Sequence, residues 1–206
     1  FFGVAVPPPG PEPKADLPEP PRNMGDRLLA ECATVEEAVA WLAKYRLTLL
    51  KASHMLLADA TGDSAVVELV AGEMQVLRDR PPFRAITNFS LKQPELGNHP
   101  CPRFTLMEQA LGSRTGPIHP EGAARLLQAV AVPKTPMEEE ERDGGTLYSN
   151  VYDLKRRVIH VYARGDFTKR LVLDVGAMLA KGSGTHSLDA LIAERGEAVS
   201  VQSSRP

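Results

Sequence analysis

Two blocks of short period-two segments, separated by helical patterns, are the feature that most constrains the fold of this chain. In each block apolar residues alternate with polar ones, and small clusters of Gly, Asp and charged residues interrupt the alternation at close intervals. Turns this tight join antiparallel neighbours, so each block predicts an antiparallel meander. The expected strands lie at residues 54–60, 64–70, 74–78 and 84–87 in the first block, and at residues 146–154, 158–163 and 169–174 in the second.

The segments around these blocks have the apolar period of amphipathic helices. Thr34 and Glu37 form a capping box before a helix whose apolar residues include Trp41, which we expect in the core. Further helices are expected around residues 28–32 and 104–111, and from Pro120 to about residue 130. Helices and antiparallel strands that come in separate blocks predict an α+β layered sandwich rather than a doubly wound parallel sheet.

Three segments differ in composition from the rest. Eight of the 18 prolines fall within the first 22 residues, and residues 7–22 are predicted to be an extended, solvated loop. Residues 133–145 form an acidic loop, and the Gly-, Ser- and charge-rich residues 182–206 are expected to be a disordered tail. Residues 1–181 then form a single domain. Its apolar start, Phe1–Val6, is typical of a strand cut from a longer chain.

Composition excludes several classes of function. The net charge of −2 gives no electrostatic basis for binding nucleic acid or a membrane surface. No apolar run approaches the length of a membrane span. The two cysteines, Cys32 and Cys101, are far apart and outside any metal-binding spacing, so neither a disulfide nor a metal site is expected. A reducing, cytoplasmic compartment is the default expectation. Phosphate-binding loops, dinucleotide-binding glycines and nucleophile elbows are absent from the sequence, so no cofactor is expected.

A few polar residues on the first block could carry chemistry. Asp59, Asp63 and Glu68 could be imagined as a cation site, but no EF-hand register surrounds them and a turn is the simpler interpretation. His54 stands at the head of a strand, where a structural histidine is favoured over a general base.

Cys101 is the other candidate for chemistry. Arg103 follows it closely and can lower the pKa of a thiol, and His99 is near in the sequence. A thiol enzyme that uses Cys101 with His99 is therefore one hypothesis. A small, half-buried residue at a helix start is the simpler interpretation of Cys101.

Six short motifs occur along the chain in a fixed order. They are the strand Gly3–Val6, the helix start Thr34–Ala38, the hairpin His54–Glu68, the pair Thr87-Asn88, the segment Cys101–Phe104 and the strand Thr146–Asp153. Each is short, but six in this order are hard to obtain by chance. Over residues 3–175 the chain resembles the linear-amide C–N hydrolases of the choloylglycine hydrolase and penicillin V acylase kind.

The resemblance implies an N-terminal-nucleophile hydrolase with a four-layer αββα sandwich, here incomplete at the N-terminus. In such enzymes a processed N-terminal cysteine attacks an amide carbonyl, with its own α-amine as the base, and forms an acyl-enzyme. Carried over residue by residue, Asn88 would donate its side-chain amide to the oxyanion. Arg103 would help to hold the thiolate and its polar network.

The resemblance also implies partners. The substrate would be a small-molecule linear amide of the N-acyl, bile-salt or penicillin type. No cofactor, metal, nucleic acid or membrane is implied, and a homo-oligomer is left open.

The nucleophile of this mechanism has no match in the sequence, nor have the arginine and aspartate that follow it in the family. Cys32 lies inside a predicted helix and Cys101 is also internal, so neither has the free α-amine that the mechanism needs. We therefore expect the C-terminal portion of an amidohydrolase, inactive alone. The alternative is a non-catalytic binding or interaction protein on the same scaffold.

Overall fold

A computed structural model describes residues 2–5, 12–13, 16–78, 83–95, 97–133 and 145–199. The sequence predicts one domain over residues 1–181, and the contacts group the chain into two compact units, Phe1–Ser113 and Arg114–Pro206. Most of the predicted acidic loop, residues 134–144, lies outside the described residues, as does part of the proline-rich loop.

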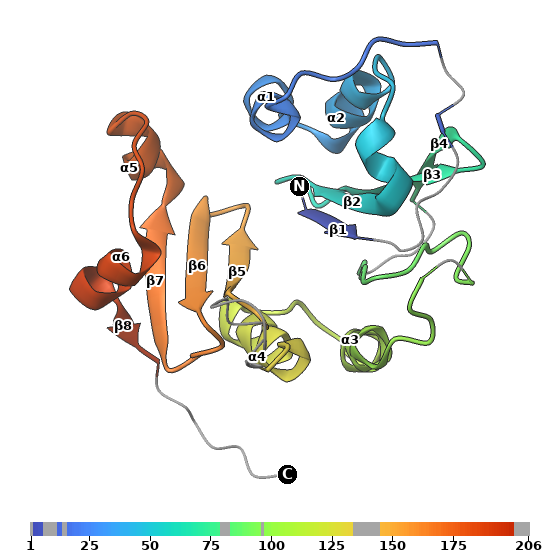
Figure 1. The fold of residues 1–206 in the computed structure, drawn as a ribbon. Helices are drawn as coiled ribbons and strands as arrows, with labels where there is room; N and C mark the ends of the chain where they lie inside the picture. Colours follow the sequence, from blue (N-terminus) through green and yellow to red (C-terminus); the bar gives the residue numbers. More distant parts are fainter. Residues whose placement is uncertain are drawn as a thin grey trace, which may run out of the picture. The chain divides into compact units, whose positions relative to one another are not determined.

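The first unit is built on a four-stranded antiparallel sheet in the order β1-β2-β3-β4 (Figure 1). Ala71 and Gly72, with φ of 52° and 82°, form the two-residue turn between β3 and β4. Positive φ at both central residues is the geometry that matches the right-handed twist of a hairpin. The strands are β1 Phe2–Ala5, β2 Ser53–Ala58, β3 Ser64–Val70 and β4 Glu73–Leu77. The meander predicted over residues 54–78 is thus confirmed.

The fourth strand expected at residues 84–87 is wrong, because this segment is irregular. Long-range side-chain contacts hold it in place of a strand ladder. The Arg84 guanidinium donates to the Ser64 carbonyl over 3.0 Å, and a ring nitrogen of His54 lies 2.8 Å from the Thr87 carbonyl oxygen. Alternating apolar residues alone do not reveal such contacts.

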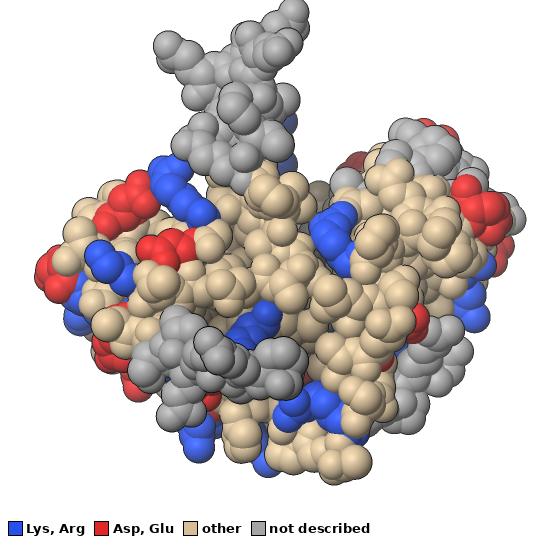
Figure 2. All heavy atoms as spheres, turned by 90° about the horizontal axis from the view of Figure 1, so that it is seen from below, with Lys and Arg blue, Asp and Glu red and all other residues tan. Residues whose placement is uncertain are grey.

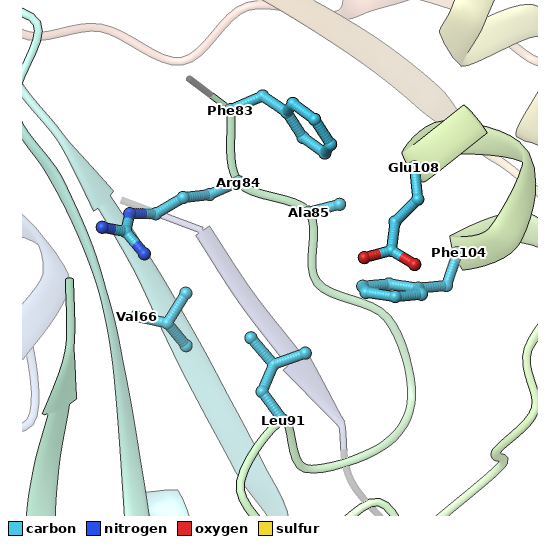
Figure 3. Close-up of a pocket in the computed structure, with 7 residues that line it drawn as sticks. All are labelled: Val66, Phe83, Arg84, Ala85, Leu91, Phe104 and Glu108. Carbon is cyan, nitrogen blue, oxygen red and sulfur yellow. The ribbon is translucent and has the colours of Figure 1, made fainter. Parts of the chain in front are cut away.

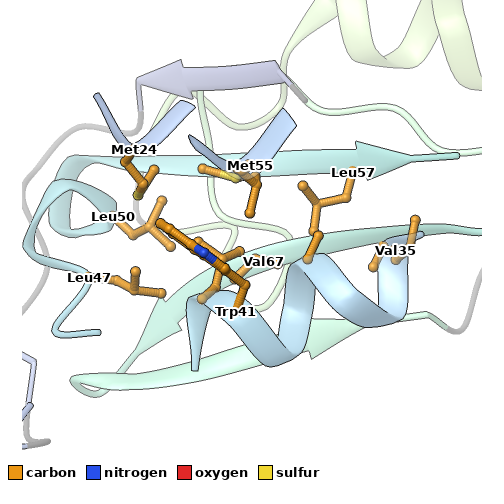
Figure 4. Packing of buried hydrophobic residues seen from close by; sticks show 12 residues of the cluster. Met24, Val35, Trp41, Leu47, Leu50, Met55, Leu57 and Val67 are labelled. Atoms are coloured by element: carbon orange, nitrogen blue, oxygen red, sulfur yellow. The ribbon is translucent and has the colours of Figure 1, made fainter. Parts of the chain in front are cut away.

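Two helices, α1 (Met24–Glu31) and α2 (Val35–Leu42), cover one face of this sheet and bury its larger core (Figure 4). The predicted capping box is confirmed: the Thr34 hydroxyl accepts from the Glu37 amide, and the Glu37 carboxylate accepts from the Thr34 amide. Trp41 lies in the core, as predicted, with its indole N–H donating to Glu31 over 2.8 Å. A short 3₁₀ helix, η1 (Thr48–Ala52), leads into β2, and α3 (Pro102–Gly112) ends the unit.

The second unit has an antiparallel sheet in the order β5-β6-β7-β8. In its core, Ala124 of the helix Pro120–Val130 packs with Tyr162 and Phe167. The rings of Tyr162 and Phe167 stack with their centroids 4.9 Å apart. The elements are α4 Pro120–Val130, β5 Tyr148–Asp153, β6 Val158–Ala163, β7 Lys169–Asp174, α5 Val175–Ala180, α6 Leu188–Arg195 and β8 Glu197–Ala198. The second predicted meander is confirmed.

The disordered tail expected over residues 182–206 needs correction where the structure describes it. The Ser187 hydroxyl accepts from the Ala190 amide and caps α6. Beyond α6, Ala198 of β8 pairs with Lys169 of β7. The helix α6 and the two-residue strand β8 are too short to give a recognisable pattern in a Gly- and Ser-rich sequence. Both are stabilised by packing against β7.

The surface has no dominant charge on the face that Figure 2 shows. Basic and acidic side chains both occur there, and neither sign forms one continuous patch. This agrees with the small net charge of −2. Among the described residues, no helix is long and apolar enough to cross a membrane.

Candidate active site

The face of the first sheet that points away from α1 and α2 carries two buried ionisable side chains. Side chains alternate along a strand, so His54 of β2 and Glu68 of β3 lie on the opposite face from Met55 and Val67, which pack under the helices. The pairing of Met55 with Val67 places the next residues, His54 and Glu68, side by side. They are only 1% and 2% exposed.

His54 joins Glu68 to the irregular segment that follows β4. Its Nδ1 lies 2.8 Å from Glu68 Oε1, and its Nε2 lies 2.8 Å from the carbonyl oxygen of Thr87. A buried charge is stable only when it is paired and hydrogen-bonded. Both conditions hold here.

Glu68 also binds the residues just beyond Asn88. Its carboxylate accepts from the Leu91 amide over 2.8 Å, the Ser90 hydroxyl over 2.8 Å and the Lys92 amide over 3.2 Å. Burial raises the pKa of Glu68, but the hydrogen bonds from His54 and from these three residues outweigh it, so the pKa lies below its ordinary value. The carboxylate is therefore ionised at neutral pH.

Asn88 and Arg103, the two site residues predicted from the sequence, are in direct contact. Arg103 lies in the first turn of α3, and its Nη2 donates to Asn88 Oδ1 over 2.6 Å. Both side chains are half-buried. A guanidinium has only donors, so it selects the oxygen of the amide and directs Nδ2, with its two hydrogens, away from itself. Arg103 thus orients the Asn88 side chain as a donor.

Cys101 lies beside this pair, immediately before α3. Burial raises the pKa of its thiol, but the Thr87 hydroxyl, the Phe104 and Arg103 amides at the helix start, and the Arg103 charge outweigh it. The thiol pKa is therefore below its ordinary value. Within ordinary hydrogen-bond limits the Thr87 hydroxyl has no partner in the described chain, so its contact with the thiol is weak.

The proposed partner of Cys101, His99, does not act on it in this structure. Its ring packs edge-on against Phe89, with centroids 4.9 Å apart. Across the described ranges, no hydrogen bond joins His99 to Cys101. The structure thus brings Cys101 together with Arg103, as the sequence suggested, but shows no hydrogen bond to His99 in the described residues.

A pocket opens beside the same two segments (Figure 3). The Phe83 and Phe104 rings point into it, whereas Arg84 extends away toward β3. The other lining residues are Val66, Ala85, Leu91 and Glu108. Phe104 follows Arg103 directly on α3, so a mainly apolar hollow and the polar pair are built from the same elements.

Asp59, one of the acidic residues that the sequence offers as a cation ligand, has a structural role. Asp59 accepts from the Val35 amide at the start of α2 over 2.8 Å, and from the Thr61 amide and hydroxyl. The Thr61 hydroxyl, helped by the surrounding amides, lowers the pKa of Asp59 despite partial desolvation. No cluster of His, Cys, Asp and Glu in the described part of the chain could hold a metal ion.

The comparisons with known proteins identify the family to which the chain belongs. The family model "acyl-coenzyme A:6-aminopenicillanic acid acyl-transferase" matches residues 19–166. The chain belongs to this acyltransferase family. No curated protein sequence matches the chain.

Among solved structures, this acyltransferase-family chain is similar to two variants of the conjugated bile acid hydrolase of Clostridium perfringens, one with an arginine-to-leucine and one with a cysteine-to-alanine substitution. The identities are 18% and 17%, each TM-score is 0.57, and each match covers 85% of this chain and 69% of the other. The chain thus has the α+β fold of these solved structures, and an α+β fold is what the sequence predicts.

His54 and Glu68 are residues of this candidate site that sequence reasoning did not assign to it. One signal could have found them. Glu68 is the only charged residue in the apolar strand Ser64–Val70, and a charge in that setting requires a buried partner.

Proposed function

We propose that this chain carries the oxyanion-stabilising side of an active site that cleaves or transfers the acyl group of a linear amide. The observation that carries the proposal is the hydrogen bond from Arg103 to Asn88 Oδ1, 2.6 Å long. It joins the two residues that the resemblance selects, and it leaves the amide oriented as a donor.

The chemistry needs such a donor. When a thiolate attacks an amide carbonyl, the π electrons move onto the oxygen, and the tetrahedral intermediate carries a negative charge there. The Nδ2 hydrogens of Asn88 would bind that oxyanion. A neutral amide suits this task because it stabilises the charge without titrating. Arg103 would hold the amide in place and favour the thiolate electrostatically. The intermediate then collapses: its C–N bond breaks, the leaving nitrogen takes the proton that the α-amine removed from the thiol, and an acyl-enzyme remains.

The proposal assigns the nucleophile to a cysteine with a free α-amine, which neither Cys32 nor Cys101 has in this sequence. The acyl-enzyme would then pass its acyl group to water or to an amine. The family model favours an amine acceptor, whereas the similar solved structures are hydrolases. The Asn88–Arg103 pair serves both reactions equally, since both pass through the same kind of oxyanion.

Turnover assays on two forms of the protein test the proposal. The purified 206-residue chain should release no amine above the buffer rate from penicillin V or a taurine-conjugated bile salt. The product of the full reading frame should release it, and added 6-aminopenicillanic acid should divert the acyl group if transfer is the main reaction. Turnover by the 206-residue chain would contradict the placement of the nucleophile. No turnover by the longer form would favour a non-catalytic binding protein on this scaffold.

A further inference from the structure

We infer that His54 is held as an imidazolium by Glu68, and that this buried ion pair positions the segment carrying Asn88. Its role in catalysis rests on the proposed function. The protonation state of His54 and the positioning of the segment are independent of the proposed function.

The hydrogen-bond partners decide the protonation state. The Thr87 carbonyl oxygen can only accept, so His54 Nε2, 2.8 Å away, must donate. Glu68 accepts from Ser90, Leu91 and Lys92, which is the behaviour of an ionised carboxylate. His54 Nδ1, 2.8 Å from Glu68 Oε1, must therefore donate as well. A ring whose two nitrogens both donate carries a positive charge.

The pair holds the segment on both sides of Asn88. His54 binds the carbonyl of Thr87, directly before it, and Glu68 binds the Ser90 hydroxyl and the Leu91 amide, two and three residues after it. The segment has no strand ladder of its own between residues 84 and 88. Side chains therefore set its register relative to β2 and β3: Arg84 binds Ser64 at one end, and His54 and Glu68 hold the part around Asn88.

The other side of the segment is closely packed too. The Asn98 amide donates to the Asn88 carbonyl over 2.8 Å. Gly97, with φ of 121°, lies so near that an added Cβ would stand 2.6 Å from that carbonyl oxygen. The Asn88 backbone is thus fixed by the ion pair's contacts to its neighbours and by a close approach of Gly97 that leaves no room for a side chain there. A shift of Thr87 would move Asn88 relative to Arg103 and Cys101.

Two measurements on the 206-residue chain test the inference, and neither needs substrate or turnover. In the first, ¹⁵N NMR of the wild-type protein at pH 7 should show both His54 ring nitrogens in the protonated range, each coupled to its own hydrogen. A neutral ring with one unprotonated nitrogen would overturn the assignment. This measurement needs no variant, so it decides the protonation state even if the variants below fold poorly.

The second measurement uses the Cys101 thiol as a reporter, because it touches Thr87. His54→Gln cannot bind Thr87 and Glu68 together, so alkylation of Cys101 at pH 7 should become faster by about tenfold as the segment opens more often. Cys32, on the other side of the sheet, serves as the internal reference. The matched control is His160→Gln, a buried histidine of the second unit, which should change the Cys101 rate by less than about twofold.

A Cys101 rate in His54→Gln equal to that in His160→Gln would overturn the positioning role. Since the readouts are a ring spectrum and a thiol rate, failure of this inference is distinct from failure of the proposed enzyme activity. If the proposed activity is absent but both readouts behave as expected, the pair still positions the segment, in a binding protein.

Discussion

Replacing Glu68 with alanine is expected to lower the free energy of unfolding of the first unit by about 3–5 kcal/mol. The variant leaves the His54 charge without its counter-ion in a site where both side chains are at most 2% exposed. It also leaves the Ser90, Leu91 and Lys92 donors without their common acceptor. Urea unfolding followed by fluorescence measures this change, because Trp41 is the single tryptophan and lies in the core of the same unit.

Glu95→Gln is the matched control for this variant. Glu95 is exposed and lies a few residues beyond the same segment, so its replacement should change the unfolding free energy by less than about 0.5 kcal/mol. A Glu68→Ala variant as stable as Glu95→Gln would contradict the buried ion pair.

The same carboxylate predicts a pH dependence. The folded-state pKa of Glu68 lies below its ordinary value of 4.5, so its contribution to stability is fully present above that value and is lost as the pH falls through the folded-state pKa. Glu68→Gln cannot titrate at this position. Its unfolding free energy should fall less steeply with acidification than that of the wild type, and parallel curves below pH 4.5 would count against the assignment.

Replacing Asn88 with aspartate is expected to separate activity from stability. In the form that carries its nucleophile, the variant should lose about 10²–10³-fold in kcat, the usual cost of removing one oxyanion donor. Its stability should be retained, because the new carboxylate still accepts from Arg103, which lies 2.6 Å from the present amide oxygen. Asn88→Ala should lose similar activity but also the hydrogen bond that holds Arg103.

Asn98→Asp is the matched control. The Asn98 side chain is exposed, and its backbone amide still donates to Asn88 in the variant. Its kcat should stay within about threefold of the wild type, as for a surface change away from the reacting atoms. If Asn88→Asp behaves like Asn98→Asp, the Asn88 amide is not the oxyanion donor.

Local chemistry explains which parts of the fold could be predicted. The Thr34 capping box and the Ala71-Gly72 turn depend on residues close in sequence, so the pattern identifies them directly. The pattern from Arg84 to Thr87 predicts a strand, whereas the segment is held irregular by Ser64 and His54, which are distant in sequence and therefore do not show in the local pattern.

The site could be predicted only in part, and for the same reason. Asn88 and Arg103 were selected by resemblance to a family, since neither residue type is distinctive by itself. Their contact, and the orientation that Arg103 imposes on the amide, depend on how the folded chain brings residues 88 and 103 together. His54 and Glu68 are far apart in the sequence, and only the β2–β3 register places them together beneath the segment.

The most direct test of the account is the turnover of Arg103→Ala in the form of the protein that carries its nucleophile. Without the guanidinium, the Asn88 amide loses the group that orients it and the thiolate loses a neighbouring charge. The account predicts a fall in kcat/KM of at least about 100-fold, with the unfolding free energy within about 1 kcal/mol of the wild type, since the side chain is half-buried. Near-wild-type turnover by this variant would contradict the account.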